Sequence, residues 1–334
     1  MISVKQTAIA GIIALTSLTA SAQNKEHVTP ESMASTHQTD ANVARAAQKI
    51  VVVTGARFSY AIIEKWIDEY LKVRPDIQVV VESRGSADPK QYDILTEVYE
   101  HDEESKNNRA YVYVGRYAIL PVATAGSGFA KTYSEKGLDE EMIQQIFFHD
   151  IFSGTANRKA IKEPYTTYTR LQRAGVPHVF SKYFGHEQND IKGVGIAGAD
   201  VHLVKALLRD SVGVTYLPVP LIFESSTRQL LKGLVILPVD LNGNGKVTGE
   251  ERIFADLDKI IEKIETANPK ELQNVPIGYL HLSVDRKNAS AEAIDFLTWV
   301  KENGDRFLRE FGYLKPDSRT PGNAELSELA ASRR

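Results

Sequence analysis

Residues 240–251 combine residue types and spacing that are typical of a twelve-residue calcium-binding loop. Gly245 is sixth, where the backbone must turn with positive φ, and Val247 is eighth, where an apolar anchor is expected. We therefore predict a structural Ca²⁺ in this loop. Oxygen atoms would come from side chains at positions one, three, five and twelve and from the main-chain carbonyl at position seven, which are Asp240, Asn242, Asn244, Glu251 and Lys246.

A tight turn is the alternative interpretation of the same residues, because Asn-Gly between two apolar runs is a strong turn signal. Asn244-Gly245 fits either interpretation, whereas the distant Glu251 favours the cation. Only Asp240 and Glu251 are ionised, and so few charged ligands imply the modest affinity that suits calcium-rich extracytoplasmic fluid. A predicted strand at 234–238 precedes the loop, which indicates a structural staple and not a switch.

The first residues have the three parts of an export signal. Lys5 supplies the positive end, residues 8–18 are apolar, and Ala20-Ser21-Ala22 is a small-residue cleavage site. We predict a signal peptide over 1–22, against the alternative of a buried N-terminal helix. Residues 23–48 and 317–334 are polar and offer little to bury, so we predict a disordered leader and a disordered tail.

Composition excludes several classes of protein. The 334 residues contain no cysteine, which rules out disulfides, thiol catalysis and a lipid-anchoring cysteine. The net charge of -3 gives no electrostatic case for binding nucleic acid or an anionic membrane. No later segment is long and apolar enough to span a bilayer. We expect a soluble, exported monomer in the periplasm.

Apolar periodicity predicts an α/β fold with helices on both faces of the sheet. Residues 50–53 form a buried strand, 62–71 repeat apolar residues at helical spacing, and 77–81 form the next strand, which together imply parallel pairing. Similar alternation follows to residue 311. Further strands are predicted at 110–114, 165–169, 212–216 and 278–284, and further helices at 140–152, 177–184, 201–208, 253–261 and 291–311.

Three turns follow predicted strands and could hold an anion. In α/β sheets ligands bind at the carboxyl ends of strands, where helix N-termini and exposed amides favour negative charge. The turns are residues 54–59, 82–86 and 169–175. The third contains Arg170, whose planar guanidinium suits an oxyanion.

Motifs along most of the mature chain resemble the phosphate-binding components of bacterial ABC uptake systems, in the branch of Bacteroidetes-type bacteria. They are Thr54-Gly55-Ala56 with Trp66 and Tyr70, and the segments 114–122, 168–170, 190–198, 210–216, 238–246, 299–300 and 311–314. The resemblance implies a two-lobed, type II periplasmic binding protein, each lobe a mostly parallel sheet flanked by helices. Lobe 1 would comprise 49–118 and 272–316, and lobe 2 would comprise 119–271.

The resemblance also implies a function and a site. A non-enzymatic protein would capture a small oxyanion, phosphate first, and deliver it to an ABC permease. Its Asp93 would accept a proton from hydrogen phosphate. The ligand-binding set would be Thr54, Ala56, Arg57, Phe58, Ser59, Ser83, Gly85, Ser86, Asp93, Arg170, Ala174 and Gly175.

The chain departs from the family pattern at two turns. Ala174-Gly175-Val176 stands where the family has Ser-Gly-Thr, and Arg57 replaces a small residue. A different ligand, or a binding-protein fold used as a scaffold, is therefore an alternative function. A hydrolase or phosphatase using residues His178, His186 and Glu187 is another, although the sequence has no Gly-x-Ser-x-Gly, His-Glu-x-x-His or phosphate-cradling lysine motif.

Overall fold

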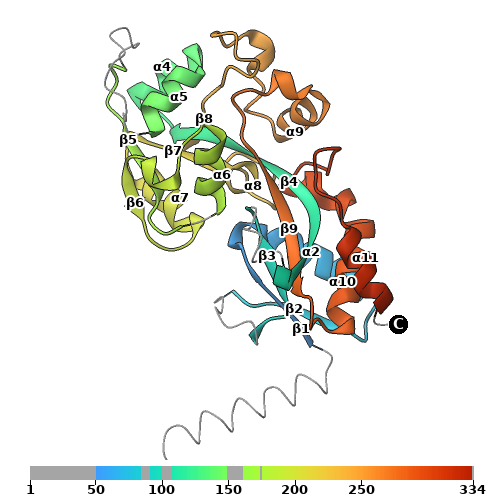
Figure 1. The fold of residues 1–334 in the computed structure, drawn as a ribbon. Coiled ribbons are helices and arrows are strands. Elements are labelled where there is room, and N and C mark those ends of the chain that lie inside the picture. The colour runs from blue at the N-terminus through green and yellow to red at the C-terminus, as the bar shows by residue number, and fades with distance from the viewer. Residues whose placement is uncertain (1–49, 84–90, 100–106, 149–160, 174, 333–334) are drawn as a thin grey trace, which may run out of the picture. The chain divides into compact units, whose positions relative to one another are not determined.

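The computed structural model describes residues 50–332 except 84–90, 100–106, 149–160 and 174 (Figure 1). The predicted signal peptide and leader, Gly85, Ser86, Ala174 and the end of the helix predicted over 140–152 lie outside the described residues. The strands are β1 (Ile50–Gly55), β2 (Gln78–Val81), β3 (Ile94–Glu97), β4 (Arg109–Thr124), β5 (Thr166–Arg170), β6 (Val194–Ile196), β7 (Gly213–Pro218), β8 (Leu234–Ile236) and β9 (Ile277–Asp285).

Helices alternate with these strands. The α-helices are α2 (Tyr60–Leu71), α4 (Gly128–Lys136), α5 (Glu140–Phe147), α6 (Gly175–Tyr183), α7 (Asp200–Arg209), α8 (Val219–Ile222), α9 (Leu257–Thr266), α10 (Ala291–Asn303) and α11 (Ala324–Ser332). Short 3₁₀ helices are η1 (Arg57–Ser59), η3 (Gln188–Asp190), η4 (Gly249–Glu251), η5 (Pro269–Glu271) and η6 (Gly304–Phe311).

The described strands pair in the order β2-β1-β3-β9-β4-β7-β5-β6, and β8 also pairs with β4. β1 is parallel to β2 and β3, and β5 is parallel to β6 and β7. The long strands β4 and β9 connect these two groups through antiparallel pairs, as Figure 1 shows in green and orange. β4 changes partner from β9 to β7 between Ala118 and Ile119.

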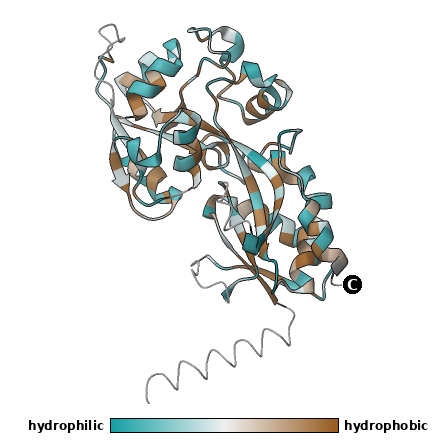
Figure 2. Cartoon of the chain, in the orientation of Figure 1, coloured by the Kyte–Doolittle hydropathy of each residue, from teal (hydrophilic) through white to brown (hydrophobic). Residues whose placement is uncertain are grey.

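The β1–α2–β2 unit forms as its apolar pattern predicted. One face of α2 is buried, with Trp66 and Tyr70 fully inaccessible. Trp66 Nε1 donates a hydrogen bond to the carbonyl oxygen of Gly304 at 3.0 Å, and Tyr70 packs edge-on against Phe296 of α10 with ring centroids 5.1 Å apart. Losing an indole of this kind costs about 3–5 kcal/mol. Figure 2 shows the brown apolar positions on the strands and on the helix faces turned toward them.

β4 is much longer than the strand predicted at 110–114, and it is buried from Ala110 to Ala123. Gly115, Arg116 and Pro121 interrupt its apolar pattern, which explains the early end of the prediction. Arg116 is tolerated in the interior because its Nε donates to the carbonyl oxygen of Lys315 at 2.7 Å and its Nη1 lies 2.6 Å from Asp317 Oδ2. β3, β6 and α4 were not predicted, because each is short or weakly periodic.

The C-terminal segment forms a helix, contrary to the predicted disordered tail over 317–334. Leu326 and Leu329 of α11 are buried, three residues apart on one helix face. The side-chain amide of Asn323 pairs with Tyr113 in β4, accepting from its N–H at 2.7 Å and donating to its carbonyl at 3.0 Å. Two leucines in a polar sequence were too weak a signal to predict the helix, which is also held by hydrogen bonds to β4.

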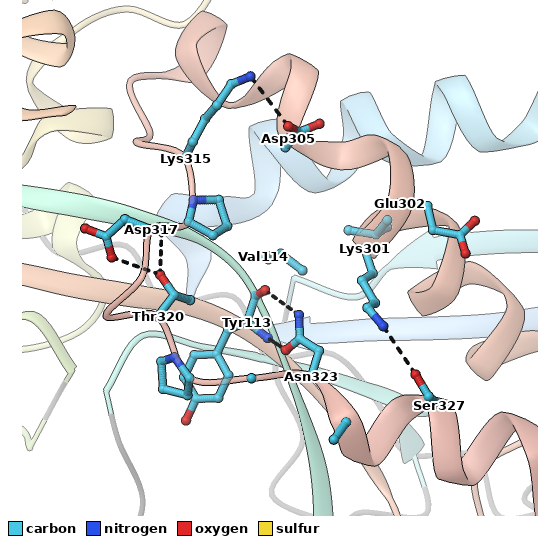
Figure 3. A pocket seen from close by; sticks show the side chains of 15 residues that line it. Tyr113, Val114, Lys301, Glu302, Asp305, Lys315, Asp317, Thr320, Asn323 and Ser327 are labelled. Atoms are coloured by element: carbon cyan, nitrogen blue, oxygen red, sulfur yellow. Dashed lines mark hydrogen bonds and ion pairs between the residues drawn. The ribbon is translucent and has the colours of Figure 1, made fainter. Parts of the chain in front are cut away.

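A cavity of about 590 Å³ lies where this segment meets β4 and α10 (Figure 3). Two of its lysines have partners within the lining: Lys315 Nζ lies 3.5 Å from Asp305, and Lys301 Nζ donates to Ser327 Oγ at 3.3 Å. These contacts hold the segment in place. Among the described residues, no helix has the length and apolar character needed to cross a membrane.

Candidate functional site

A second cavity, of about 410 Å³, lies at the ends of the parallel strands. The ends of β1 and β3 contribute one side, and the end of β5 with the starts of α6 and α7 contributes the other. This is where α/β folds bind ligands. Its lining residues are Gly55, Ala56, Arg57, Phe58, Leu95, Thr96, Glu97, Val98, Tyr99, Arg170, Gly175, Val176, Gly198, Ala199 and Asp200.

The first predicted turn forms one wall and is clamped onto β3. Gly55 has φ +129°, and a side chain there would place its Cβ 2.1 Å from the carbonyl oxygen of Thr96. The N–H of Ala56 donates to that same oxygen at 2.9 Å. The amide of Ala56, which the family resemblance assigned to the ligand, is thus engaged within the fold.

Both predicted hydroxyls of this turn also have internal partners. Ser59 Oγ is fully buried, donates to the carbonyl oxygen of Ala56 at 2.7 Å and lies 2.9 Å from Thr96 Oγ1. Thr54 Oγ1 donates to the carbonyl oxygen of Glu82 at 2.9 Å. These two side chains shape the turn and are not part of the cavity lining described above.

The side chains of Arg57 and Phe58, two other predicted residues of this turn, lie in different environments. Arg57 is exposed at the rim. Phe58 is buried, packing edge-on against Tyr117 at 5.4 Å and in parallel with Tyr313 at 6.4 Å between ring centroids. The lining therefore combines an exposed cation, Arg57, with the buried ring of Phe58.

Arg170 forms the opposite wall together with a carboxylate that sequence reasoning missed. Arg170 Nη1 lies 2.6 Å from Asp200 Oδ1, and the two side chains are only 12% and 16% exposed. Arg170 Nε is buried and has no hydrogen-bond partner among the described residues. A buried donor without a partner costs about 1–3 kcal/mol, so an acceptor from a ligand would be stabilising here.

Glu97, the last residue of β3, is a second missed carboxylate in the lining. It is buried, and its Oε2 accepts a hydrogen bond from Ser283 Oγ at 2.6 Å. Arg109 Nε in turn donates to that hydroxyl at 2.8 Å. Its position at the carboxyl end of a strand could have identified Glu97, but the sequence analysis did not predict β3. Arg57 and Arg170 are therefore balanced by Glu97 and Asp200 among the described lining residues.

The third predicted turn approaches the β3 side closely at Gly175. A Cβ on Gly175 would lie 2.4 Å from Val98 Cγ2 and 3.0 Å from Tyr99 Cδ1. Glycine is needed here for space and not for its backbone conformation, because its φ is not positive. The two walls of the cavity are thus in direct contact at this point.

Two further predicted residues lie elsewhere. Asp93 Oδ2 accepts from the backbone N–H of Val52 at 2.8 Å, so this carboxylate helps to hold β1 and is not part of the cavity lining. Ser83 is exposed and is also not part of that lining. Glu97, unlike Asp93, is part of the cavity lining.

The predicted calcium loop folds around its two carboxylates. Asp240 and Glu251 are 1% and 3% exposed, yet neither forms an ion pair with a described lysine, arginine or histidine. Gly245 has φ +82°, as the sixth position of such a loop requires. Backbone N–H groups surround the carboxylates: those of Asn244 and Gly245 donate to Asp240, and those of Leu241 and Thr248 donate to Glu251.

The donor set fits a cation, because the two buried carboxylates have no ion pair with a described residue and a bound cation would balance their charge. Asn242 and Asn244 turn their oxygens to the backbone N–H groups of Asn244 and Lys246. The loop also connects separate elements. Asn274 Nδ2 donates to the carbonyl oxygen of Asp240 at 2.6 Å, and Arg252 Nη1 donates to that of Ser134 at 2.6 Å.

The residues of the alternative hydrolase site make separate contacts. His186 stacks on Phe148 with ring centroids 4.1 Å apart, Glu187 pairs with Lys182, and His178 lies 5.9 Å from the ring of Tyr99. No group of three potential metal-binding side chains (His, Cys, Asp or Glu) occurs in the described part of the chain.

Comparison with known proteins identifies the fold. No protein-family model matches the chain, and no curated protein matches it. Among solved structures, it resembles one described as a phosphate ABC transporter substrate-binding protein with bound phosphate from Clostridium perfringens. The sequences are 12% identical, the TM-score is 0.55, and the match covers 80% of this chain and 100% of that chain.

An ABC-type phosphate transport receptor from Vibrio cholerae is 14% identical, with a TM-score of 0.47 and coverage of 80% and 100%. At 12% identity, the likeness to the Clostridium perfringens structure shows the fold. The chain has the mixed α/β fold of type II periplasmic binding proteins, and that prediction is confirmed. The antiparallel pairs made by β4 and β9 add to the parallel pairing that the sequence predicted.

Proposed function

We propose that this chain is an exported solute-binding protein that captures a small oxyanion in the cavity beside Arg170 and delivers it to an ABC permease. The buried, unpartnered Nε of Arg170 is the observation that carries the proposal. Phosphate is the first candidate, because the neighbour from Clostridium perfringens holds phosphate within the same fold. We further propose that residues 1–22 direct export to the periplasm and are then removed.

Arg170→Gln tests the assignment while keeping most of the side-chain volume. Removing the partner of a buried anion costs about 3 kcal/mol, which lowers affinity by about 100-fold. Isothermal titration calorimetry with phosphate, sulfate and arsenate measures this directly. Arg173→Gln is the matched control, because Arg173 is exposed and is not part of the cavity lining.

Two results would contradict the proposal. Wild-type protein that binds none of these anions at millimolar concentration would favour the scaffold alternative. Binding that survives Arg170→Gln unchanged would move the site elsewhere. Product formation from a phosphate ester, measured in the same samples, would instead support the hydrolase alternative.

We also propose that residues 240–251 bind Ca²⁺ and so stabilise the connection between the loop, Asn274 and the end of α4. Two buried carboxylates without ion pairs to described residues support this proposal. Asp240 and Glu251 would supply the charged ligands, with Asn242, Asn244 and the carbonyl of Lys246 completing the set. The ion would stabilise the fold and take no part in binding the oxyanion.

A further inference from the structure

We propose that the preferred ligand of the Arg170 cavity is an organic monoanion, with one oxyanion headgroup on a short apolar body, and not a bare inorganic oxyanion. The inference rests on the proposed function, since it names the class of ligand for the same site. Three properties of the lining carry it: its size, its apolar surface and its charge balance.

Size is the first argument. The cavity measures about 410 Å³, within the range of roughly 300–1,000 Å³ typical of pockets for organic ligands. A tetrahedral oxyanion displaces three or four waters, or on the order of 100 Å³. Most of the cavity would remain filled with water around such an ion. An organic substituent would occupy this volume.

Apolar side chains make up much of the wall, and they provide the second argument. Phe58, Val98 and Val176 are buried residues, and Leu95 and Tyr99 are partly buried. Val98 and Tyr99 meet Gly175 next to Val176, which gives a continuous apolar surface between the two walls. A ligand body that buries about 100 Å² there would gain affinity on the order of 50-fold.

Charge and hydrogen bonding supply the third argument. Arg57 and Arg170 are matched by Glu97 and Asp200 among the described lining residues. A dianion would leave this set with two uncompensated negative charges, whereas a monoanion leaves one, so the smaller charge is favoured. The nearby hydroxyl of Thr96 is already hydrogen-bonded in the buried pair described above. Arg170 Nε is therefore the donor that remains for a single headgroup of charge minus one.

The headgroup can be a carboxylate or a phosphonate, because a guanidinium recognises both. Calorimetry with matched pairs separates head from body: acetate against phenylacetate, and methylphosphonate against phenylphosphonate, with inorganic phosphate as reference. Measurements at pH 6 and constant ionic strength favour the phosphonate monoanions. We expect the phenyl member of at least one pair to bind at least tenfold more tightly than its methyl partner and than phosphate.

Two variants test the apolar wall. Tyr99→Ser removes the aromatic surface, and Val176→Thr is a near-isosteric replacement that keeps the core filled should the first variant fold poorly. Each should reduce the preference for the phenyl ligand at least threefold and leave the affinity for the methyl ligand within twofold. Arg170→Gln should weaken both members of the pair equally.

The outcomes of these experiments distinguish the proposed function from the proposed class of ligand. If inorganic phosphate binds as tightly as or more tightly than every organic probe, and Arg170→Gln abolishes that binding, the proposed function stands and the organic ligand class is wrong. If no probe binds at millimolar concentration, or if Arg170→Gln changes nothing, the proposed function fails and this inference fails with it. An organic preference that neither wall variant alters also overturns the inference.

Discussion

Replacing Asp200 by asparagine should destabilise the empty protein and tighten its binding of an anion. Asp200 Oδ1 lies 2.6 Å from Arg170 Nη1, and both side chains are largely buried. Asparagine keeps the shape and one acceptor oxygen, but it removes the counter-charge of Arg170. The guanidinium then remains a mostly buried cation until a ligand supplies a negative charge.

The size of the expected loss of stability follows from the burial of the Arg170–Asp200 ion pair. Two unit charges about 4 Å apart attract by about 4 kcal/mol at an effective dielectric constant of about 20. The asparagine oxygen and the lost desolvation penalty of the carboxylate recover part of this. We therefore expect a loss of about 1–3 kcal/mol in the free energy of unfolding. Removing the competing carboxylate should raise anion affinity by about 10- to 100-fold, or about 1.4–2.8 kcal/mol.

Urea denaturation measures the first effect, and titration calorimetry with phosphate and phenylphosphonate measures the second. Asp258→Asn is the matched control. Asp258 pairs with Arg228 at the surface and is 75% exposed, so its loss should change stability by at most about 1 kcal/mol and leave anion affinity unchanged. An Asp200→Asn protein that is as stable as wild type and binds anions no more tightly would refute the reasoning.

Three other perturbations test separate parts of the molecule. Calcium at 100 times its dissociation constant should stabilise chelator-treated protein by about 2.7 kcal/mol, and Asp240→Asn or Glu251→Gln should remove the gain in melting temperature. A wild-type melting temperature that does not change with calcium would favour the tight-turn interpretation of the loop. Asn323→Ala should lower the free energy of unfolding by about 1–3 kcal/mol, because two backbone groups of β4 lose their partner; the exposed Asn288→Ala should stay within about 0.5 kcal/mol, and equal effects would contradict the role of α11. Burial, aided by neighbouring cations, lowers the pKa of His178 below its usual 6.5. The contribution of the neutral side chain to folding stability is therefore fully present above pH 6.5 and is lost as pH falls through the pKa of the folded state. His178→Gln should make the denaturation midpoint depend less on pH between pH 7 and 5, and an unchanged pH dependence would show that His178 does not cause it.

Apolar periodicity and turn residues predicted those helices, strands and turns whose formation depends on residues close together in the sequence. The apolar spacing of Ile62, Trp66 and Tyr70 predicted α2 and its buried face, which the structure confirms. Arg170 was predicted to bind the ligand because it comes at the end of a predicted strand, where α/β sheets place their ligands. Such signals are local, since they reflect backbone geometry and the side chains within one or two turns.

Only the tertiary structure determined which side chains face one another. Arg170 meets Asp200 across 30 residues, and Glu97 meets Ser283 across 186. Asn323 was assigned to a disordered tail, yet it pairs with β4 because that edge has backbone groups to satisfy. The charge balance and volume of the cavity depend on these long-range contacts. No single segment of sequence encodes them, because burial and pairing are decided by elements that meet only after the chain has folded.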